Sequence, residues 1–218
     1  MNSARLRAIY RRLRDCYGHQ QWWPGETPFE IMIGAILTQN TAWANVEKAI
    51  ANLRAADCLD AHGITTLKAD RLAALIRPSG YFNIKARRLQ NFCRWYLEQG
   101  ELVGLSHLAD QELRQALLSV NGIGPETADD ILLYAFERPV FVIDAYTRRL
   151  FSRLGLFDHD AGYEELRGWF EDHLGHDAAL FNDYHAQIVN HAKDICRKQP
   201  RCGACCLRDG CPGVHGKY

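Results

Sequence analysis

Apolar residues recur every three to four positions along most of the chain, the spacing of helices with one buried face. The clearest stripe contains Phe29, Met32, Ile33, Ile36 and Leu37. Similar periodicity predicts helices over residues 3–16, 43–54, 66–76, 84–98, 109–119, 125–136, 145–155, 161–174 and 178–196. Strand-like alternation is confined to residues 139–143, too short and solitary for a sheet, which we interpret as a buried connector. The pattern therefore predicts an all-α protein, arranged in two lobes.

The helix that carries this stripe has a recognisable start. Thr27 suits the N-cap, Pro28 the first helical position and Glu30 the third, where its carboxylate could close a capping box. We therefore expect the helix to begin at residue 28.

Length and composition are those of an ordinary globular chain. It has 218 residues, of which 47% are hydrophobic and 24% charged, enough for a sizeable core. The longest apolar run, residues 31–37, is far short of the ~20 residues that span a membrane. Residues 1–15 are too charged for a secretory signal peptide. We expect a cytoplasmic protein, associated with the nucleoid if it is bacterial.

Charge is balanced overall but unevenly distributed. The 26 basic and 26 acidic residues cancel, so the global positive field common in nucleic-acid-binding proteins is absent. Residues 5–14 and 81–97 nevertheless contain several basic residues and no acid. Such runs are typical of solvated helix faces, and also of a small protein that touches DNA on one side.

The eight cysteines fall into two groups. Cys16, Cys58 and Cys93 are scattered, as buried small hydrophobic residues are. The other five crowd together at positions Cys196, Cys202, Cys205, Cys206 and Cys211. Because a cytosolic chain keeps its thiols reduced, this cluster favours a metal site over disulfides.

Residues 117–128, LLSVNGIGPETA, have the pattern of a helical hairpin. Gly122 and Gly124 permit a tight turn, and Pro125 suits the first position of the following helix. Free amides at that helix start could bind an anion such as a DNA phosphate. The same pattern also fits a plain packing corner between two helices.

The stretch LLSVNGIGPETADDILLYAFERPVFVIDAYTRRLFSRLGL resembles the helix-hairpin-helix and Gly/Pro–Asp (HhH-GPD) core of the endonuclease III superfamily of DNA glycosylases. LTQNT at 37–41 resembles the family's glutamine segment, and GYFNIKARRL at 80–89 its Gly-aromatic-Asn-x-Lys-Ala motif. The resemblance implies a two-lobed fold that binds double-stranded DNA with a damaged base. The DNA-binding residues it implies are Gln39, which would fill the hole left by a flipped base, with Lys85, Asn121, Gly122, Ile123, Gly124 and Thr127.

Asp144 matches the essential aspartate of this family. Breaking an N-glycosidic bond develops positive charge on the sugar, which a carboxylate stabilises while it activates water. Asp144 could also cap the helix that begins at Ala145, and the two roles are compatible.

Glu126 is the main departure from the family pattern. Bifunctional members have a lysine here that forms a Schiff base, and glutamate cannot be that nucleophile. An acid near a helix start complements the helix dipole. The resemblance then implies a monofunctional glycosylase that leaves the abasic strand unbroken.

Trp22-Trp23-Pro24, LTQNTAW, RPSGYFN and GIGPETADDILLYA resemble segments of one branch of the superfamily, the 3-methyladenine DNA glycosylase III branch. Carried over from that branch, the walls of the base pocket are Trp22, Trp23, Pro24 and Trp43. A cationic alkylated purine between indole faces gains on the order of 1–2 kcal/mol of cation–π attraction. Without the resemblance, Trp22 and Trp43 would be interpreted as ordinary core or interface aromatics. Gln187 replaces a lysine of that branch, which leaves the exact substrates open.

The spacing of Cys196, Cys202, Cys205 and Cys211 resembles the 4Fe–4S cluster loop of the superfamily, whose first gap is usually one residue longer. Four thiolates on a short loop could equally bind one zinc ion. Cys206 is an alternative third ligand, or a spare packed thiol. Basic residues surround the loop, and the resemblance implies that the cluster orders this basic loop beside the DNA backbone.

Together these features predict a monomeric DNA glycosylase for alkylated purines with a 4Fe–4S cluster. We expect a six-helix lobe over residues 25–136, and a second lobe of residues 1–24 and 137–218 that carries Asp144 and the cluster, with the active cleft between them. The alternatives are a glycosylase for oxidised or mismatched bases and a non-catalytic protein that binds damaged DNA. A pure binder would gain nothing from an acid aimed at the sugar.

Overall fold

The structure, a computed structural model, describes residues 2–20, 22, 25–158 and 160–215. Within these ranges every regular element is a helix, so the all-α prediction is confirmed. The connector at residues 139–143 forms no strand and is buried from Val140 to Ile143. In the described part of the chain, no helix combines the length and the apolar character that crossing a membrane requires.

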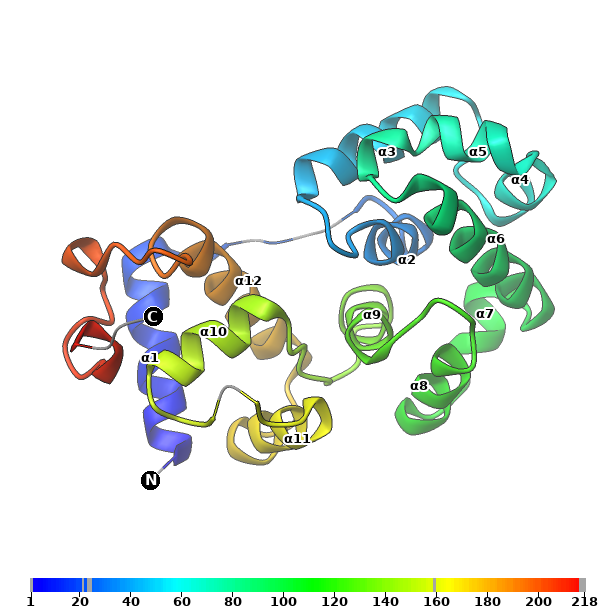
Figure 1. Ribbon diagram of the computed structural model, residues 1–218. Helices are drawn as coiled ribbons and strands as arrows, with labels where there is room; N and C mark the ends of the chain where they lie inside the picture. Colours follow the sequence, from blue (N-terminus) through cyan, green and yellow to red (C-terminus); the bar gives the residue numbers. More distant parts are fainter. Residues whose placement is uncertain (1, 21, 23–24, 159, 216–218) are drawn as a thin grey trace. The chain divides into compact units, whose positions relative to one another are not determined.

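Contacts along the backbone divide the chain into two units, each visible in Figure 1. The central unit is Trp23–Arg138, and the terminal unit joins Met1–Trp22 to Pro139–Tyr218. The terminal unit therefore brings together the two ends of the described sequence.

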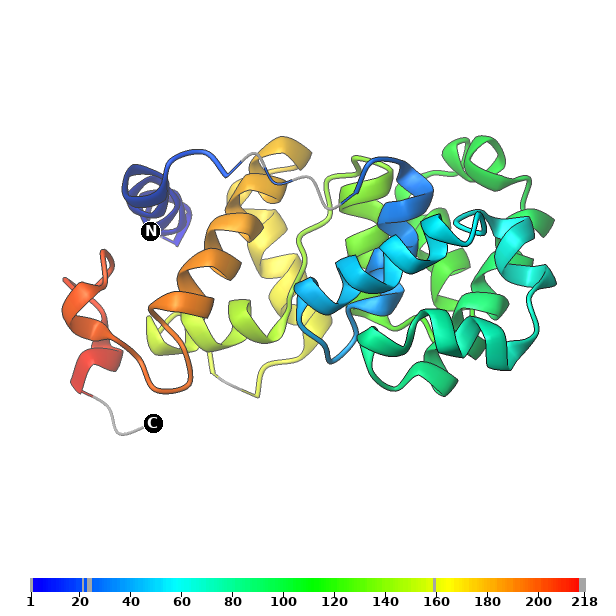
Figure 2. The same cartoon turned by 90° about the horizontal axis from the view of Figure 1, so that it is seen from above.

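The central unit is built around one helix that is buried along nearly its whole length. Helix α2, Pro28–Leu37, is buried from Glu30 to Leu37 and contacts α3, α6 and α9 (Figures 1 and 2). The other elements of this unit are α3 Trp43–Ala55, α4 Ala61–Thr66, α5 Ala69–Leu75, η1 Arg77–Ser79, α6 Phe82–Glu98, α7 Glu101–Ser106, α8 Asp110–Leu118, α9 Pro125–Asp130 and the π-helical segment η2 Ile131–Ala135.

The terminal unit has an aromatic core. Its elements are α1 Asn2–Tyr17, α10 Ala145–Arg153, α11 Tyr163–Leu174, α12 Ala178–Asp194, η3 Cys202–Ala204 and η4 Pro212–His215. Phe141 of the connector stacks on Phe170 of α11 with ring centroids 4.2 Å apart, and Phe151 of α10 meets Phe170 edge-on. All three rings are fully buried, and burial of each such side chain adds about 1.5–3 kcal/mol to the free energy of unfolding.

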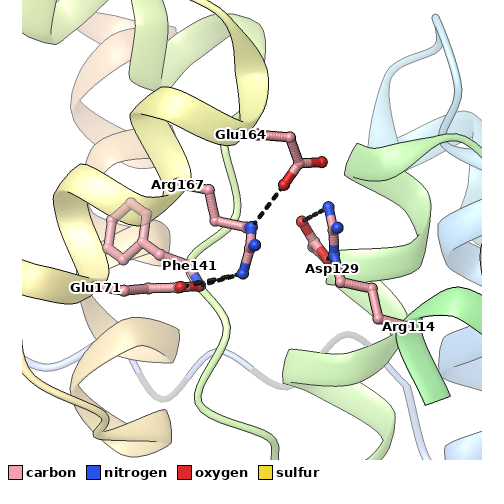
Figure 3. A network of polar contacts seen from close by, with 6 residues as sticks. All are labelled: Arg114, Asp129, Phe141, Glu164, Arg167 and Glu171. Carbon is pink, nitrogen blue, oxygen red and sulfur yellow. Dashed lines mark hydrogen bonds and ion pairs between the residues drawn. The ribbon is translucent and has the colours of Figure 1, made fainter. Parts of the chain in front are cut away.

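A polar contact holds the connector as well. The Phe141 amide donates to Glu171 Oε1 at 3.0 Å, and Arg167 bonds the same carboxylate one helical turn away (Figure 3). Because the connector is tied to α11 by both its side chain and its backbone, the position of Asp144, which follows it, is well defined.

Most helix boundaries agree with the apolar pattern, and the differences have local causes. The helix predicted over 66–76 starts later, at Ala69, because Leu67 and Lys68 are extended after α4 ends. Helices α4 and α7 are too short to show a periodic stripe. The helix predicted over 125–136 changes at Ile131 from α-helical to the wider π-helical winding.

Candidate active site

Asp144 stands where the buried connector meets α10. It is the N-cap of that helix, and its Oδ1 accepts a 2.7 Å hydrogen bond from the Thr147 amide. The capping role considered from the sequence is therefore present. The second carboxylate oxygen, Oδ2, lies 3.6 Å from His185 Nε2 of α12. The Asp144 side chain is 14% exposed, so it is sheltered but not sealed from solvent.

The surroundings of Asp144 favour its charged form. Burial alone would raise the pKa of this carboxyl, but the His185 imidazole and the Thr147 amide outweigh it and hold the pKa below its ordinary value. Asp144 is therefore a carboxylate at neutral pH, the form that can stabilise positive charge.

His185 is a site residue that sequence reasoning missed. Its imidazole is buried, facing Asp144, and the Trp22 ring lies 6.5 Å from it, centroid to centroid, at an interplanar angle of 38°. The available signal was its place beside Gln187 in the segment compared with the 3-methyladenine branch. A single buried histidine carried no pattern of its own.

The segment that leads to Trp22 is anchored along α12. Gln187 donates from Nε2 to the Gly18 carbonyl at 2.6 Å, and Asn190 donates to Gln20 Oε1 at 3.1 Å. The backbone amide of Gln20 in turn donates to Asp183 Oδ1 at 3.2 Å. The buried Gln187 thus has a structural task in this chain. Two of the predicted pocket residues, Trp23 and Pro24, lie outside the described residues.

The central unit carries the predicted hairpin between α8 and α9. Gly122 has a φ of +105°, and a Cβ there would overlap the side chain of Arg88 on α6. Gly124 caps α9 and Pro125 opens it, as expected. A buried, two-pronged ion pair joins Arg114 to Asp129 at 2.6 and 3.1 Å and holds α8 to α9 (Figure 3).

Gln39 is brought onto this hairpin. Its Nε2 donates to the Gly122 carbonyl at 3.1 Å and to Thr127 Oγ1 at 2.9 Å, while Arg88 donates to its Oε1. Three residues expected to contact DNA therefore form one hydrogen-bonded group. Of the others, Asn121 and Gly124 are exposed and Ile123 is buried.

Lys85 is placed differently from these residues. It is 1% exposed, and its Nζ donates to the carbonyls of Leu37 and Ser79 at 2.8 and 2.7 Å. Burial, helped by the charge of Arg88, lowers the pKa of Lys85 to about 8. Its hydrogen bond to the Leu37 carbonyl holds the end of α2, where the loop that carries Gln39 starts. In this structure Lys85 therefore supports that loop from inside and is not itself exposed.

Trp43 begins α3 and is half-buried. Its ring packs on Gly34 of α2, where a Cβ would come within 3.1 Å of it. The same residue lines an open hollow of about 490 Å³, in which three carboxylates and one guanidinium gather. The hollow is lined by Gly25, Glu26, Glu30, Trp43, Glu47, Ile50 and Arg54.

Glu126 is exposed in the first turn of α9. An acid there favours the helix start through the helix dipole, the structural role considered from the sequence. No amine stands at this position of the hairpin.

The C-terminal cysteines do not all face the same way. Cys196, Cys202, Cys205 and Cys211 line one small apolar cavity together with residues of α10. Cys206 instead interacts with Cys16 and Tyr17 of α1. Arg153 donates to the backbone carbonyls of Cys196 and Arg197, which fixes the entry to the loop. In the described residues, no three His, Cys, Asp or Glu side chains are close enough to bind a single metal ion.

Basic side chains surround this loop and are exposed. They are Lys193, Arg197, Lys198, Arg201 and Arg208. A rim of five exposed cations is suited to a phosphate backbone.

Comparison with known proteins finds, over most of the chain, the family that the sequence motifs resemble. The profile of the family described as "HhH-GPD superfamily base excision DNA repair protein" matches residues 33–174. A relative from Methanocaldococcus jannaschii, named "Putative DNA repair glycosylase MJ1434", is 48% identical over 206 residues, covering 93% of this chain and 94% of the relative. Endonuclease III of Escherichia coli is 30% identical over 216 residues, covering 97% and 96%.

Solved structures share the fold. A crystal structure of H. pylori 3-methyladenine DNA glycosylase (MagIII), bound to 1,N6-ethenoadenine, superposes with a TM-score of 0.72 at 29% identity, covering 88% of this chain and 95% of that one. A non-covalent complex of endonuclease III with DNA superposes with a TM-score of 0.83 at 21% identity, covering 98% and 96%.

Proposed function

Because the chain belongs to the HhH-GPD superfamily of base excision DNA repair proteins, we propose that it is a monofunctional glycosylase for alkylated purines of the 3-methyladenine type. It takes a damaged nucleotide flipped out of duplex DNA and hydrolyses the bond between base and sugar. The observation that carries the proposal is Asp144, a sheltered carboxylate held in its charged form at the start of α10.

Asp144 supplies what this reaction needs from the protein. As the base departs, positive charge develops on the sugar, and a fixed carboxylate stabilises that charge most in the transition state. The same carboxylate orients and deprotonates the attacking water. An alkylated purine is cationic within the nucleoside and is already a good leaving group, so no strong general acid is required.

The choice of alkylated purines rests on the surroundings of Trp43. This indole lines a hollow that also contains Glu26, Glu30 and Glu47, and Arg54 pairs with the first two of these acids. An indole face and surplus negative charge both favour a cationic base over a neutral one. The likeness to the H. pylori 3-methyladenine glycosylase supports the same choice.

Gln187 is compatible with this substrate class. In the 3-methyladenine branch a lysine stands here, whereas the buried amide of Gln187 binds the Gly18 carbonyl. A neutral side chain adds no repulsion toward a cationic base, and the contact helps to hold the segment that ends at Trp22.

The direct test is to incubate the protein with methylated duplex DNA and identify the free bases released. We expect 3-methyladenine or 7-methylguanine among them, with the DNA strand left intact. Release of only oxidised pyrimidines, uracil or mismatched thymine would replace the alkylpurine assignment with the broader glycosylase one. Binding to lesion DNA without release of any base would identify a non-catalytic damage-binding protein.

We predict that no Schiff-base intermediate forms. With Glu126 at the position of the lyase lysine, the sugar meets no amine from the hairpin, so the reaction ends at the abasic site. Borohydride added during turnover should trap no protein–DNA adduct on any substrate that is processed. Efficient trapping would mean that another lysine acts as nucleophile and that the enzyme is bifunctional.

We also predict that Trp43→Ala weakens capture of cationic bases more than of neutral ones. Losing a stacking face costs about 1–3 kcal/mol for any base, and only a cation loses the additional π attraction. Single-turnover excision and binding should be compared on matched duplexes carrying 7-methylguanine or uracil. Equal losses on both lesions would contradict a cation-selective pocket.

The C-terminal loop fits a 4Fe–4S cluster in its donor set, four thiols that line one cavity. We propose Cys196, Cys202, Cys205 and Cys211 as the ligands, since these four thiols line one cavity while Cys206 faces α1. In such a cluster each thiolate binds a different iron, so the sulfurs lie farther apart than around one zinc, where each is about 2.3 Å from the ion. Iron, sulfide and zinc analysis of the purified protein distinguishes the two sites.

The proposed cluster has a structural task. It would fix the loop that carries Arg197, Lys198, Arg201 and Arg208, which follow Lys193 at the end of α12. Iron–sulfur clusters supply electron-transfer chemistry, which base hydrolysis does not use. The chain's own residues carry out the reaction: Asp144 holds the charge and moves the proton, and the basic rim binds phosphates.

A further inference from the structure

His185 connects two features of the terminal unit that the proposed function uses separately. One edge of its imidazole meets the Asp144 carboxylate, with Nε2 at 3.6 Å from Oδ2. The Trp22 ring lies against the same imidazole at 6.5 Å between centroids. The imidazole is 6% exposed, so its place is set by packing and not by solvent.

We propose that His185 is a positioning residue for base excision, which orients the Asp144 carboxylate. This proposal rests on the proposed function. His185 also packs beside Trp22, a proposed wall of the base pocket. One side chain thus supports both the carboxylate and the segment that receives the base.

The geometry explains why Asp144 needs a second support. The Thr147 amide fixes Oδ1 at 2.7 Å, but this bond leaves the second carboxylate oxygen, Oδ2, free to move. His185 Nε2 lies on a different helix, 3.6 Å from Oδ2, and this contact limits that freedom. A carboxylate held at both oxygens is preorganised for the transition state, and no rearrangement is needed when the charge develops.

The same contact offsets the effect of burial. The groups that favour the charged form of Asp144 are His185 on α12 and Thr147 on its own helix. Without His185, burial would be opposed by Thr147 alone, and the pKa of Asp144 would rise toward or above its ordinary value of about 4. Activity that needs the carboxylate would then be lost at a higher pH than in the wild type.

Two variants at this position separate positioning from packing. His185→Asn is too short to reach Asp144, whereas His185→Gln places an amide nitrogen close to the position of Nε2 and can donate to Oδ2. We expect His185→Asn to slow single-turnover excision by up to about 100-fold, the range for a misplaced reactive group. His185→Gln should recover a large part of the rate. Binding to a duplex with an uncleavable abasic-site analogue, and the thermal midpoint, control for folding.

The pH dependence gives a readout that packing alone would not change. In His185→Asn the acid limb of the excision rate should move to higher pH than in the wild type, because burial of the Asp144 carboxyl is then opposed by Thr147 alone. Titration of the Asp144 carboxyl carbon by NMR measures the same shift without any substrate.

The NMR titration also keeps the two proposals apart. If the wild type releases no base but the Asp144 pKa rises in His185→Asn, the contact is real and the proposed function fails. If the Asp144 titration is the same in the wild type and in His185→Asn, the positioning role is overturned, whatever the activity. A rate loss that His185→Gln fails to reduce would also overturn it, since donation to Oδ2 would then be irrelevant.

Discussion

Asp144→Asn is expected to lower the single-turnover rate of base excision at least ~100-fold and to leave binding to lesion DNA nearly unchanged. The loss is that of one electrostatic stabiliser of a transition state. Asparagine keeps an oxygen that can accept the Thr147 amide, so the cap of α10 is retained and the fold should not change. The substitution therefore removes the charge and little else.

The measurement is excision under excess enzyme, together with the dissociation constant on the same duplex. Asp144→Ala is the matched comparison, because it removes the charge and also the cap, which costs about 1 kcal/mol of stability. We expect both variants to be equally inactive, and only the alanine variant to melt at a lower temperature. A rate for Asp144→Asn within tenfold of the wild type would mean that another group stabilises the sugar.

Cys205→Ser is expected to remove most of the iron, whereas Cys206→Ser, at the adjacent position, is expected to leave the iron content unchanged. The wild-type protein should be brown and should contain about four iron and four sulfide ions per chain. Cys205 lines the cavity with three other cysteines, so its loss should remove most of the iron and the visible absorption. Cys206 faces Cys16 and Tyr17, so serine there should leave both unchanged.

The comparison needs protein produced with ample iron, analysed for iron, sulfide and zinc. Loss of iron in the Cys206 variant alone would show that Cys206, and not Cys205, is the third ligand. Stoichiometric zinc without visible absorption in the wild type would rule out the cluster. The thermal midpoint should fall with the iron, because metal binding and folding of such a loop are linked.

How far the sequence predicts this fold depends on how local each determinant is. The start of α2 contains one contact that a local pattern predicts and one that it does not. Thr27 does accept the Glu30 amide, as the capping pattern predicts. The Glu30 carboxylate, however, pairs with Arg54 of α3 at 2.6 Å, a partner too distant in the sequence for a capping pattern to include.

The same limit applies to the candidate site. Asp144, Gln39, Gly122 and Thr127 are part of short motifs whose spacing is visible in the chain. His185 becomes a site residue only when α12 packs against α10, and the bonds of Lys85 depend on where α2 and η1 end. Partners between distant elements leave no periodic trace in a single sequence.

The composition of the terminal unit has a consequence for the order of events during synthesis. Helix α1 buries Leu6, Ile9 and Leu13, and its neighbours are α11 and α12. A ribosome releases α1 before the central unit and releases those neighbours only after it, so the central unit can complete its own core in the meantime. The apolar face of α1 is therefore exposed to solvent while more than a hundred further residues are synthesised. This interval is when the nascent chain is most exposed to aggregation and to chaperones.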